Sequence, residues 1–460
     1  MNPIEERIAK VLGEACPEEG GMTQARAARI AELCGIKGLT PEDVLQGLTP
    51  AGIASIWMHR RMASKACQSQ GLDGRHYPLL PFSRLVHESI RQNEEALKAW
   101  TFPLLLRAKD NEIDAERLSS AVEQAIGNHP VFSMHITEDG KQWYEKGYRT
   151  PYLEAKVESK EGCVFLSLTL NRILGDATSF VLLAQNIWRA YRGEDLPKDT
   201  YLQYLSKHVE SSVTEEYHQH GEWLAQRYAQ PDYPLLPWQD SPTGELPPRG
   251  HYTPYVLHPD YADKLQALSH KERITPNAFF GLVTALAIMD FNGTDQAGLT
   301  WAYMGRETHE QMFIFGSLHR DIPMKITKTK TKTETKMETK TNTETASLFA
   351  QLREQMEQGI IHSDYPFTLS SPSDSPWHTA VNVLVQPSIA EAMEGCPAEF
   401  EFIPTVGTEE SHCMLDIDIN LEPLTLTFNY SPQHYTEESI RRFAGLIDHN
   451  AKILLSPFIY

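Results

Sequence analysis

The sequence VFLSLTLNRILGDATSF, residues Val164–Phe180, decides the fold that we expect for this chain. Its first seven residues form an apolar run with large and β-branched side chains, which is typical of a buried strand. The run breaks at Asn171-Arg172, and Gly175–Ser179 has the composition of a turn. Apolar residues recur at helical spacing from Phe180 onward, so the stretch predicts a strand, a polar turn and a helix.

The size and composition of the chain are those of an ordinary soluble globular protein. Its 460 residues suffice for two or three domains, with 41% hydrophobic and 22% charged residues. The net charge of −19 argues against a nucleic-acid binder, which needs a basic face. No apolar run approaches the roughly 20 residues of a membrane span, and MNPIEERIAK lacks the apolar core of a secretory signal. The six scattered cysteines form no CxxC pair, so we expect reduced thiols, no metal site and a cytoplasmic protein.

Residues 1–62 predict a small helical module. Apolar residues recur at helical spacing from Ile4 to Leu12, and a second helix is expected to end at Gly35. A short helix over Pro41–Leu45 follows, and Thr49 is the expected N-cap of a last helix. The polar residues 63–76 are interpreted as a linker.

The remainder of the chain predicts a mixed α/β fold in two lobes, with a proline-rich crossing at Pro231–Pro254. The helix expected at Pro276–Met289 is apolar nearly all round and therefore buried. Further expected elements are a strand at Ala99–Ala108, an amphipathic helix at Ile113–Ile126, hairpins at Met134–Tyr144 and Met414–Tyr430, strands at Leu299–Met304 and Ala380–Val385, and helices at Ser347–Ile361 and Glu437–Leu455.

Thr327–Thr345 alternates threonine with lysine, glutamate, asparagine and one methionine. A segment of this composition has no apolar face and cannot build a core. We expect an insertion in a solvent-exposed loop or an extension of a strand. Charge-based binding is an alternative that the mixed signs disfavour.

The turn of the opening stretch resembles the core motif of condensation domains of nonribosomal peptide synthetases. That motif is His-His-x-x-x-Asp-Gly, often with a serine two residues later. Asp176 and Ser179 match it, whereas Asn171, Arg172 and Ala177 replace the two histidines and the glycine. In the family, the second histidine faces the condensing thioesters and is the residue on which the chemistry depends.

Stretches on both sides extend this resemblance over residues 77–460. They are YPLLPFSRLVH at Tyr77, NHPVFSM at Asn128, Gly305-Arg306, Gly316–Lys325 and Asp364–Phe367. The resemblance implies two lobes like chloramphenicol acetyltransferase in a V, with residues 77–245 as the N-lobe and 246–460 as the C-lobe. It also implies a tunnel between the lobes that admits pantetheine arms, with the motif at its midpoint.

Residues 1–62 are similar to a peptidyl carrier domain. Gly20-Gly21-Met22-Thr23 occupies the slot of Gly-Gly-x-Ser, and Leu39–Ile53 is similar to a later stretch of carriers. The family's serine carries phosphopantetheine, but the methyl group of Thr23 crowds that approach, so we expect no modification. The resemblance implies carrier domains or other synthetase modules as partners. It implies no bound cofactor beyond phosphopantetheine-tethered substrates.

The resemblance assigns roles to the site residues. Arg172 stays protonated and only donates hydrogen bonds, so it suits a carboxylate, a phosphate or an oxyanion and cannot replace a basic histidine. Asp176 is expected to pair with Arg306 of the other lobe, the alternative being a cap on the following helix. His319 is a candidate substitute base, with a structural role as its alternative. Asn171 is expected to be structural whether Asp176 pairs with Arg306 or caps the helix, and His129 is expected to belong to the scaffold.

A charged Arg172 in a narrow tunnel needs a partner, and we expect a protein carboxylate or an anionic ligand. Three functions remain open. The first is a condensation-domain homologue related to amide-bond formation between carrier-tethered thioesters, with an altered or inactive centre. The second is a stand-alone acyltransferase that acylates an amine or an alcohol. The third is a non-catalytic docking or anion-binding module.

Overall fold

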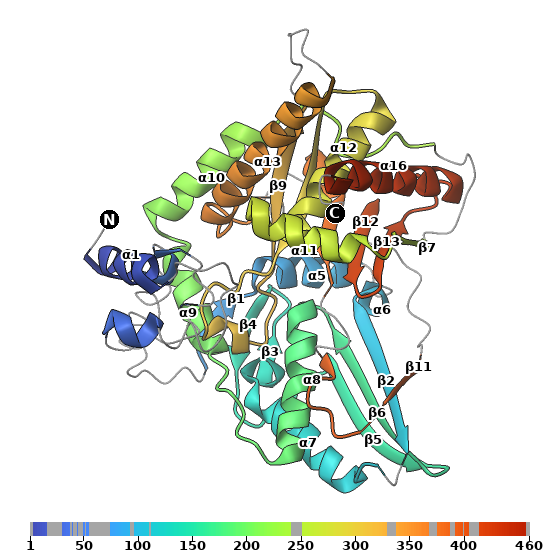
Figure 1. The fold of residues 1–460 in the computed structure, drawn as a ribbon. Coiled ribbons are helices and arrows are strands. Elements are labelled where there is room, and N and C mark those ends of the chain that lie inside the picture. The colour runs from blue at the N-terminus through green and yellow to red at the C-terminus, as the bar shows by residue number, and fades with distance from the viewer. Residues whose placement is uncertain are drawn as a thin grey trace.

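The structure is a computed structural model of the chain. It describes residues 3–15, 30–36, 39, 44, 49–50, 52–54, 74–92, 96–109, 112–240, 251–328, 337–367, 375–386, 392–398, 400–403 and 414–456. Thr23 and the rest of the carrier-type motif therefore lie outside the described residues. Two mixed α/β lobes lie one above the other in Figure 1, as the sequence predicts.

The first lobe is built on an antiparallel sheet with the strand order β11-β2-β6-β5. Helices α7 and α8 pack together on this sheet (Figure 1). The predicted buried strand is β6, whose side chains alternate between buried and half-buried. The bounds are β2 Thr101–Lys109, β5 Leu153–Lys160, β6 Cys163–Asn171, β11 Glu401–Ile403, α7 Ala115–Asn128 and α8 Ala177–Arg192.

Shorter elements complete this part of the chain. A three-stranded sheet has the order β1-β4-β3, and its β3–β4 hairpin confirms the one predicted at Met134–Tyr144. Helix α5 lies near the junction of the two lobes (Figure 1). The bounds are β1 His76–Pro78, β3 Met134–Ile136, β4 Lys141–Tyr144, α5 Pro81–Gln92, α6 Ala96–Ala99, α9 Tyr201–Ser211, α10 Glu215–Tyr228 and a 3₁₀ helix at Pro130–Ser133.

The second lobe contains a six-stranded sheet with the order β7-β13-β12-β10-β8-β9. Strand β10 runs parallel to β8 and β12, and the other pairs are antiparallel. Helix α12 is buried on all sides, as predicted, and α16 begins and ends at the predicted residues. The bounds are β7 His251–Val256, β8 Gln296–Tyr303, β9 Arg320–Thr327, β10 Asn382–Val385, β12 Leu415–Leu421, β13 Leu424–Tyr430, α11 Tyr261–Glu272, α12 Pro276–Asn292, α13 Met337–Ile361, α16 Glu437–Leu455, and 3₁₀ helices at Gln311–Phe313 and Pro376–Thr379.

The two faces of the six-stranded sheet differ in polarity. Along β12, Leu415, Ile417 and Ile419 are buried in the core with α12 and α16. Asp416 and Asp418 alternate with them and therefore project from the opposite face. The face of the sheet opposite the core is therefore polar along β12.

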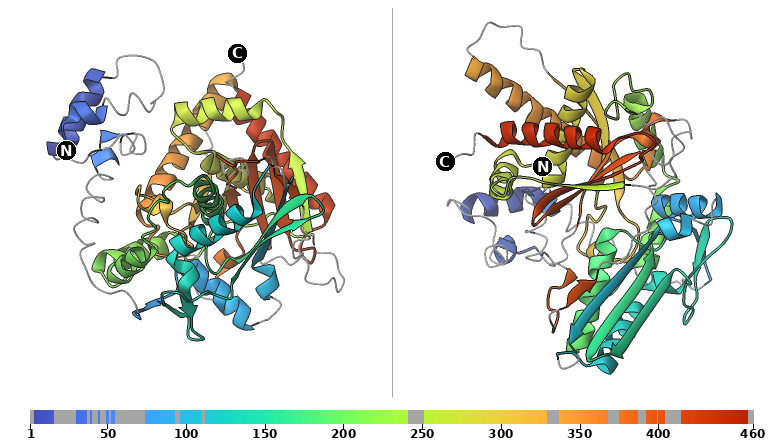
Figure 2. Two further views of the ribbon diagram at one scale, coloured as in Figure 1. Left: turned by 90° about the horizontal axis from the view of Figure 1, so that it is seen from below. Right: turned by 90° about the vertical axis from the view of Figure 1, so that its right-hand side faces the viewer.

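Two segments cross the boundary that the sequence places at residues 245/246. Strand β11 joins the sheet of the first lobe through β2, and Trp188 Nε1 donates to the carbonyl of Ala392 at 2.9 Å. Helix α10 precedes the boundary in the sequence but packs on the second lobe, where the Tyr228 hydroxyl donates to Gln355 Oε1 at 2.8 Å. The lobes therefore exchange segments (Figure 2).

The N-terminal module has a small core of its own. Helix α1, Pro3–Ala15, contributes Ile8, which packs with Ile30, Cys34 and Ile53. Gly35 adopts a φ of +57° after the second helical segment, and Thr49 Oγ1 accepts from the amide of Gly52 at 3.0 Å. The predicted helix end and N-cap are thus confirmed.

The threonine-rich segment is in part helical, contrary to the predicted loop or strand extension. Helix α13 begins at Met337, ten residues before the predicted start at Ser347, because helix propagation into polar residues needs only backbone hydrogen bonds.

Within the described ranges, no single helix is long and apolar enough to cross a membrane. Among these residues, only the α11–α12 pair, bent by 100°, has the length and the apolar composition that a span would need.

Candidate functional site

The motif turn joins β6 to α8, and Asp176 is the N-cap of that helix. Its Oδ1 accepts hydrogen bonds from the amide and the hydroxyl of Ser179, at 3.0 and 2.9 Å. An aspartate at this position satisfies an amide that the helix leaves unpaired and complements the helix dipole. The alternative role considered for Asp176 is therefore present.

The expected ion pair between Asp176 and Arg306 is present as well. Arg306 Nη1 lies 2.9 Å from Oδ2, and Nη2 lies 3.0 Å from Oδ1. The two residues are only 2% and 6% exposed, and Oδ2 also accepts from the amides of Leu318 and His319. Burial raises the pKa of the Asp176 carboxyl, but the charge of Arg306 and these hydrogen bonds outweigh it and hold the pKa at about 2.

The loop between β8 and β9 is shaped to receive this pair. Arg306 Nη2 also donates to the carbonyls of Ile314 and Gly316, at 3.1 and 3.2 Å. Gly305 before it has a φ of +66°, and a Cβ there would lie 1.9 Å from the carbonyl oxygen of Leu318. Only glycine fits, so the Gly-Arg dipeptide is a geometric requirement of this loop.

Asn171 is structural, as predicted. Its Nδ2 donates to Thr101 Oγ1 at 3.0 Å and to the carbonyl of Leu97 at 3.3 Å. Its Oδ1 accepts from the amide of Ile173 at 2.9 Å. The side chain therefore ties the end of β6 to the start of β2, and every polar atom faces the protein.

Arg172 lies among three aromatic rings. Its guanidinium carbon is 4.9 Å from the ring centre of Phe82, 5.6 Å from that of Trp100 and 5.5 Å from that of Phe102. No carboxylate of the described residues lies within 4.0 Å. The expected protein carboxylate is therefore missing among the described residues, where cation–π contacts stabilise the half-buried guanidinium, and the anionic ligand stays a prediction.

His319 lies against the same ring as Arg172. Its imidazole centre is 4.3 Å from that of Phe82, and no hydrogen bond joins either ring nitrogen to a residue that the structure describes. Nδ1 is buried. Burial is the main cause that lowers the pKa of His319. The negative charges of Asp321 and Asp176 raise this pKa, and the positive charges of Arg172 and Arg306 lower it. The ring is therefore neutral near pH 7 and able to accept a proton.

Asp418 is a residue that the sequence analysis missed. It projects from the polar face of β12, and its Oδ1 accepts from Gln386 Nε2 at 2.6 Å. Burial raises the pKa of this carboxyl, and the charge of Arg172 acts against that rise. The strict alternation in LDIDINL was the available signal, since it places Asp416 and Asp418 on the face opposite the core.

His129 belongs to the scaffold, as predicted. Its Nδ1 lies 2.6 Å from Asp199 Oδ2, and Asn186 Nδ2 lies 3.0 Å from its Nε2. Because the amide donates to Nε2, Nδ1 carries the proton and donates to Asp199. All three residues are buried, and Asp199 also accepts from the amide of Phe315.

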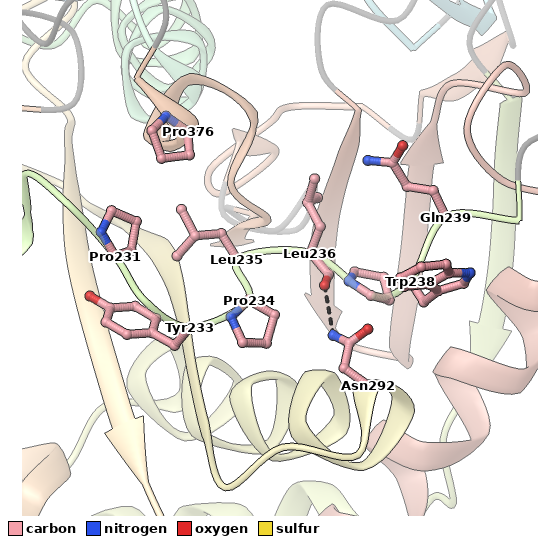
Figure 3. A pocket seen from close by; sticks show the side chains of 10 residues that line it. Pro231, Tyr233, Pro234, Leu235, Leu236, Trp238, Gln239, Asn292 and Pro376 are labelled. Atoms are coloured by element: carbon pink, nitrogen blue, oxygen red, sulfur yellow. Dashed lines mark hydrogen bonds between the residues drawn. The ribbon is translucent and has the colours of Figure 1, made fainter.

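A pocket of about 490 Å³ lies apart from the motif, beside the crossing between the lobes (Figure 3). Prolines and aromatic rings line it, and Asn292 donates to the carbonyl of Leu236 at 2.8 Å. None of Arg172, Asp176, Arg306 and His319 lines this pocket. It therefore contributes nothing to the chemistry of the motif.

Comparison with known proteins supports the family predicted from the motif. The family model described as "Condensation domain" matches residues 148–456, about two thirds of the chain, including Asp176 and Arg306. No sequence among the curated proteins matches significantly.

Three solved structures show the shared fold. The condensation domain from Monacolin K polyketide synthase MokA is similar with a TM-score of 0.65 and 14% identity, over 83% of this chain and 97% of that one. The epimerization domain from the third module of tyrocidine synthetase B has a TM-score of 0.63 and 15% identity, over 84% of this chain and 98% of that one. The complex of the X-domain and OxyB from teicoplanin biosynthesis has a TM-score of 0.61 and 14% identity, over 84% of this chain and 95% of that one. With a family model that covers more than half of its residues, the chain belongs to the condensation-domain family.

Proposed function

We propose that the chain catalyses acyl transfer from a thioester to an amine, with His319 as the proton acceptor. The observation that carries this proposal is a neutral imidazole with no hydrogen-bond partner among the described residues, lying against the same Phe82 ring as Arg172. The residue in the family's second histidine slot cannot accept a proton here, whereas an imidazole from the β8–β9 loop lies beside it. The base is thus supplied by the second lobe.

The proposed step balances without a further reagent. The amine nitrogen attacks the thioester carbonyl, a C–N bond forms, and the carbonyl oxygen takes up the negative charge. His319 accepts the proton that the amine loses. The C–S bond then breaks, and the departing thiolate takes a proton from the imidazolium. General base catalysis of this kind contributes about 10²–10⁴-fold in rate.

Arg172 has the second role in this proposal. Its guanidinium, a cation that proteins do not deprotonate, is fixed by aromatic rings. A fixed cation beside the base suits the stabilisation of an oxyanion or of a carboxylate. Asp176 and Arg306 act as positioning residues, because the carboxylate and both Nη groups of the guanidinium are hydrogen-bonded within the protein.

The thioester donor is proposed to arrive on a carrier domain, through its phosphopantetheine arm. The family membership supports this, and residues 1–62 are proposed to be a carrier-like module that does not carry the arm itself. A small helical core in this module supports that assignment. The free thiols of Cys34, Cys163 and Cys396 support a cytoplasmic location.

Intact-mass detection of acyl transfer tests the proposal. The full chain is mixed with an acyl-loaded carrier and a panel of amine and alcohol acceptors, and the transferred acyl mass is followed. We expect transfer to an amine, and a loss of about 10²-fold or more in His319→Gln. The matched control is His135→Gln, because the ring centre of His135 also lies close to that of an aromatic ring, Trp143, at 4.0 Å, and His135 belongs to β3, outside the motif turn and the β8–β9 loop. Equal rates in wild type and His319→Gln would contradict the proposal.

The second candidate is a non-catalytic docking module. The replacement of the motif histidine by Arg172 favours it, and so does the likeness to the X-domain, whose structure was solved in complex with OxyB. This function predicts no transfer to any acceptor by the wild type. It also predicts no transfer by Arg172→His, whereas a catalytic centre would tolerate or gain from a second imidazole.

A further inference from the structure

The ring of Phe82 contacts both side chains that carry the chemistry of the site. Its centre lies 4.3 Å from that of the His319 imidazole and 4.9 Å from the guanidinium carbon of Arg172. The planes of Phe82 and His319 are inclined at 67°, an edge contact, whereas the guanidinium lies over the ring. Aromatic faces attract cations, and aromatic pairs favour edge contacts. One ring from α5 therefore meets a group of the motif turn and a group of the opposite lobe.

Phe82 is itself fixed by the core of the first lobe. It lies in the first turn of α5 and is 7% exposed. Its ring meets that of Trp100 at 5.7 Å and 88°, and Trp100 Nε1 donates to Ser89 Oγ of the same helix at 3.2 Å. Phe102, the third ring around Arg172, is in contrast 46% exposed. Because protein cores are close-packed, the buried Phe82 ring is a rigid support for what lies against it.

The imidazole of His319 depends on this support for its orientation. The backbone amide of His319 donates to Asp176 at 3.1 Å, which fixes the chain but not the side-chain torsions. Within the described part of the chain, neither ring nitrogen takes part in a hydrogen bond, and the Phe82 ring is the aromatic contact of the imidazole. Packing against Phe82 therefore determines how the ring is turned.

We propose that Phe82 is the positioning residue of the site, which holds the imidazole of His319 and the guanidinium of Arg172 in one arrangement. The contact with His319 excludes water from the imidazole, and the contact with Arg172 keeps the cation beside it. Burial is the main cause that lowers the pKa of His319, and the Phe82 ring is part of that burial. This role rests on the proposed function in one respect, namely that His319 is the acting base.

Titration of His319 in the full chain tests this role without any thioester. Histidine labelled with ¹³C at Cε1 reports the protonation of each ring, and His319→Gln identifies the resonance. We expect Phe82→Ala to move the pKa of His319 upward, towards its ordinary value of 6.5, because water then reaches the imidazole. Phe82→Leu keeps an apolar side chain there and should move the pKa less. An unchanged titration in folded Phe82→Ala would overturn the proposal.

The motion of the Arg172 guanidinium is the second measurement. Rotation about its Nε–Cζ bond is followed by NMR on arginine-labelled protein, with Arg172→Gln to identify the resonance. Phe82→Leu removes the cation–π attraction of one ring, so the rotation should become about twofold or more faster. A wild-type rotation rate in Phe82→Leu would overturn the proposal, and this measurement decides the matter should Phe82→Ala fail to fold.

Phe291→Leu is the matched control. The ring of Phe291 also lies against a guanidinium, that of Arg442 at 5.0 Å, but it belongs to α12 in the second lobe. This variant should change neither the titration of His319 nor the rotation of Arg172. Circular dichroism and the unfolding midpoint of each variant show that it is folded.

Acyl transfer separates this role from the proposed function. If His319 is the base, the rate falls at low pH as His319 becomes protonated, and in Phe82→Ala this fall should move to higher pH in step with the titration. A shifted titration without transfer by the wild type would overturn the proposed function alone. Transfer by the wild type, with neither the titration nor the rotation changed in the Phe82 variants, would overturn the positioning role alone.

Discussion

Asp176 and Arg306 lie 130 positions apart and join through two hydrogen bonds of 2.9 and 3.0 Å. Their side chains are 3% and 0% exposed, so water screens the pair very little. The same carboxylate caps α8 and accepts two amides of the loop before β9. One side chain therefore fixes the motif turn, the helix after it and the loop of the opposite lobe.

Removal of this carboxylate should destabilise the protein strongly. We expect Asp176→Ala to lower the free energy of unfolding by about 3–5 kcal/mol, because it leaves Arg306 buried without its counter-charge. Urea denaturation measures this, with Glu437→Ala as the control. Glu437 forms an exposed ion pair with Arg441, whose removal should cost less than about 1 kcal/mol. Similar losses in both variants would contradict the interpretation.

The pair should also make stability depend on pH in the acid range. The folded pKa of Asp176, about 2, is below its ordinary value of 3.8. A depressed pKa contributes stability that is fully present above about pH 4 and is lost as the pH falls towards 2. The difference corresponds to about 2 kcal/mol. Urea unfolding between pH 5 and pH 2.5 should show this loss in the wild type and a shallower one in Asp176→Asn. Parallel curves would disprove the assignment.

Gly305 should tolerate no side chain. Gly305→Ala places an alanine at a positive φ, where it is strained, and its Cβ would overlap the carbonyl oxygen of Leu318. The loop must therefore move, and Arg306 must move with it. Gly293→Ala is the matched control, because Gly293 has a φ of +68° with open space around it. We expect the control to lose about 1–2 kcal/mol of unfolding free energy from backbone strain alone, and Gly305→Ala to lose clearly more. Thermal unfolding distinguishes the two, and equal shifts would contradict the predicted clash.

Because aromatic rings surround Arg172, replacing its charge should lower the stability of the protein only slightly. Arg172→Met keeps an unbranched apolar chain among the rings and loses only cation–π attraction, worth about 0.5–2 kcal/mol. Trp100→Ala should cost more, about 3–5 kcal/mol, because it empties a buried volume. Equilibrium unfolding compares them. A loss above about 3 kcal/mol in Arg172→Met would indicate that Arg172 has a carboxylate partner after all.

The N-terminal module should stay unmodified. Thr23 occupies the slot of the carrier serine, and its methyl group crowds the approach of a phosphopantetheinyl transferase. Incubation with coenzyme A and a broad-specificity transferase should leave the intact mass unchanged. Thr23→Ser is the informative variant, because a gain of one arm there would assign the block to the methyl group. A gain in the wild type would contradict the prediction.

The sequence by itself determined the elements and the family. Local periodicity shows where helices and strands lie, because 3.6- and 2-residue repeats are written along the chain, and α16 was predicted to the residue. Short polar patterns likewise revealed Asp176 as a cap, Thr49 as a cap and Gly35 as a helix end. The Asp176–Arg306 pair followed from the matched motifs on both sides. These features need only neighbours in sequence or a known pattern.

Only the tertiary structure decided what surrounds Arg172. Phe82, Trp100 and Phe102 lie 70 or more residues before it, and no periodicity indicates that their rings converge on one guanidinium. His319 and Asp418 come from two further elements of the opposite lobe. Contacts between distant segments depend on how the two sheets pack and exchange strands, and side-chain charge then depends on the resulting burial. The surroundings of Arg172, and with them the charge of nearby side chains, therefore follow from packing, which the local pattern of the sequence does not specify.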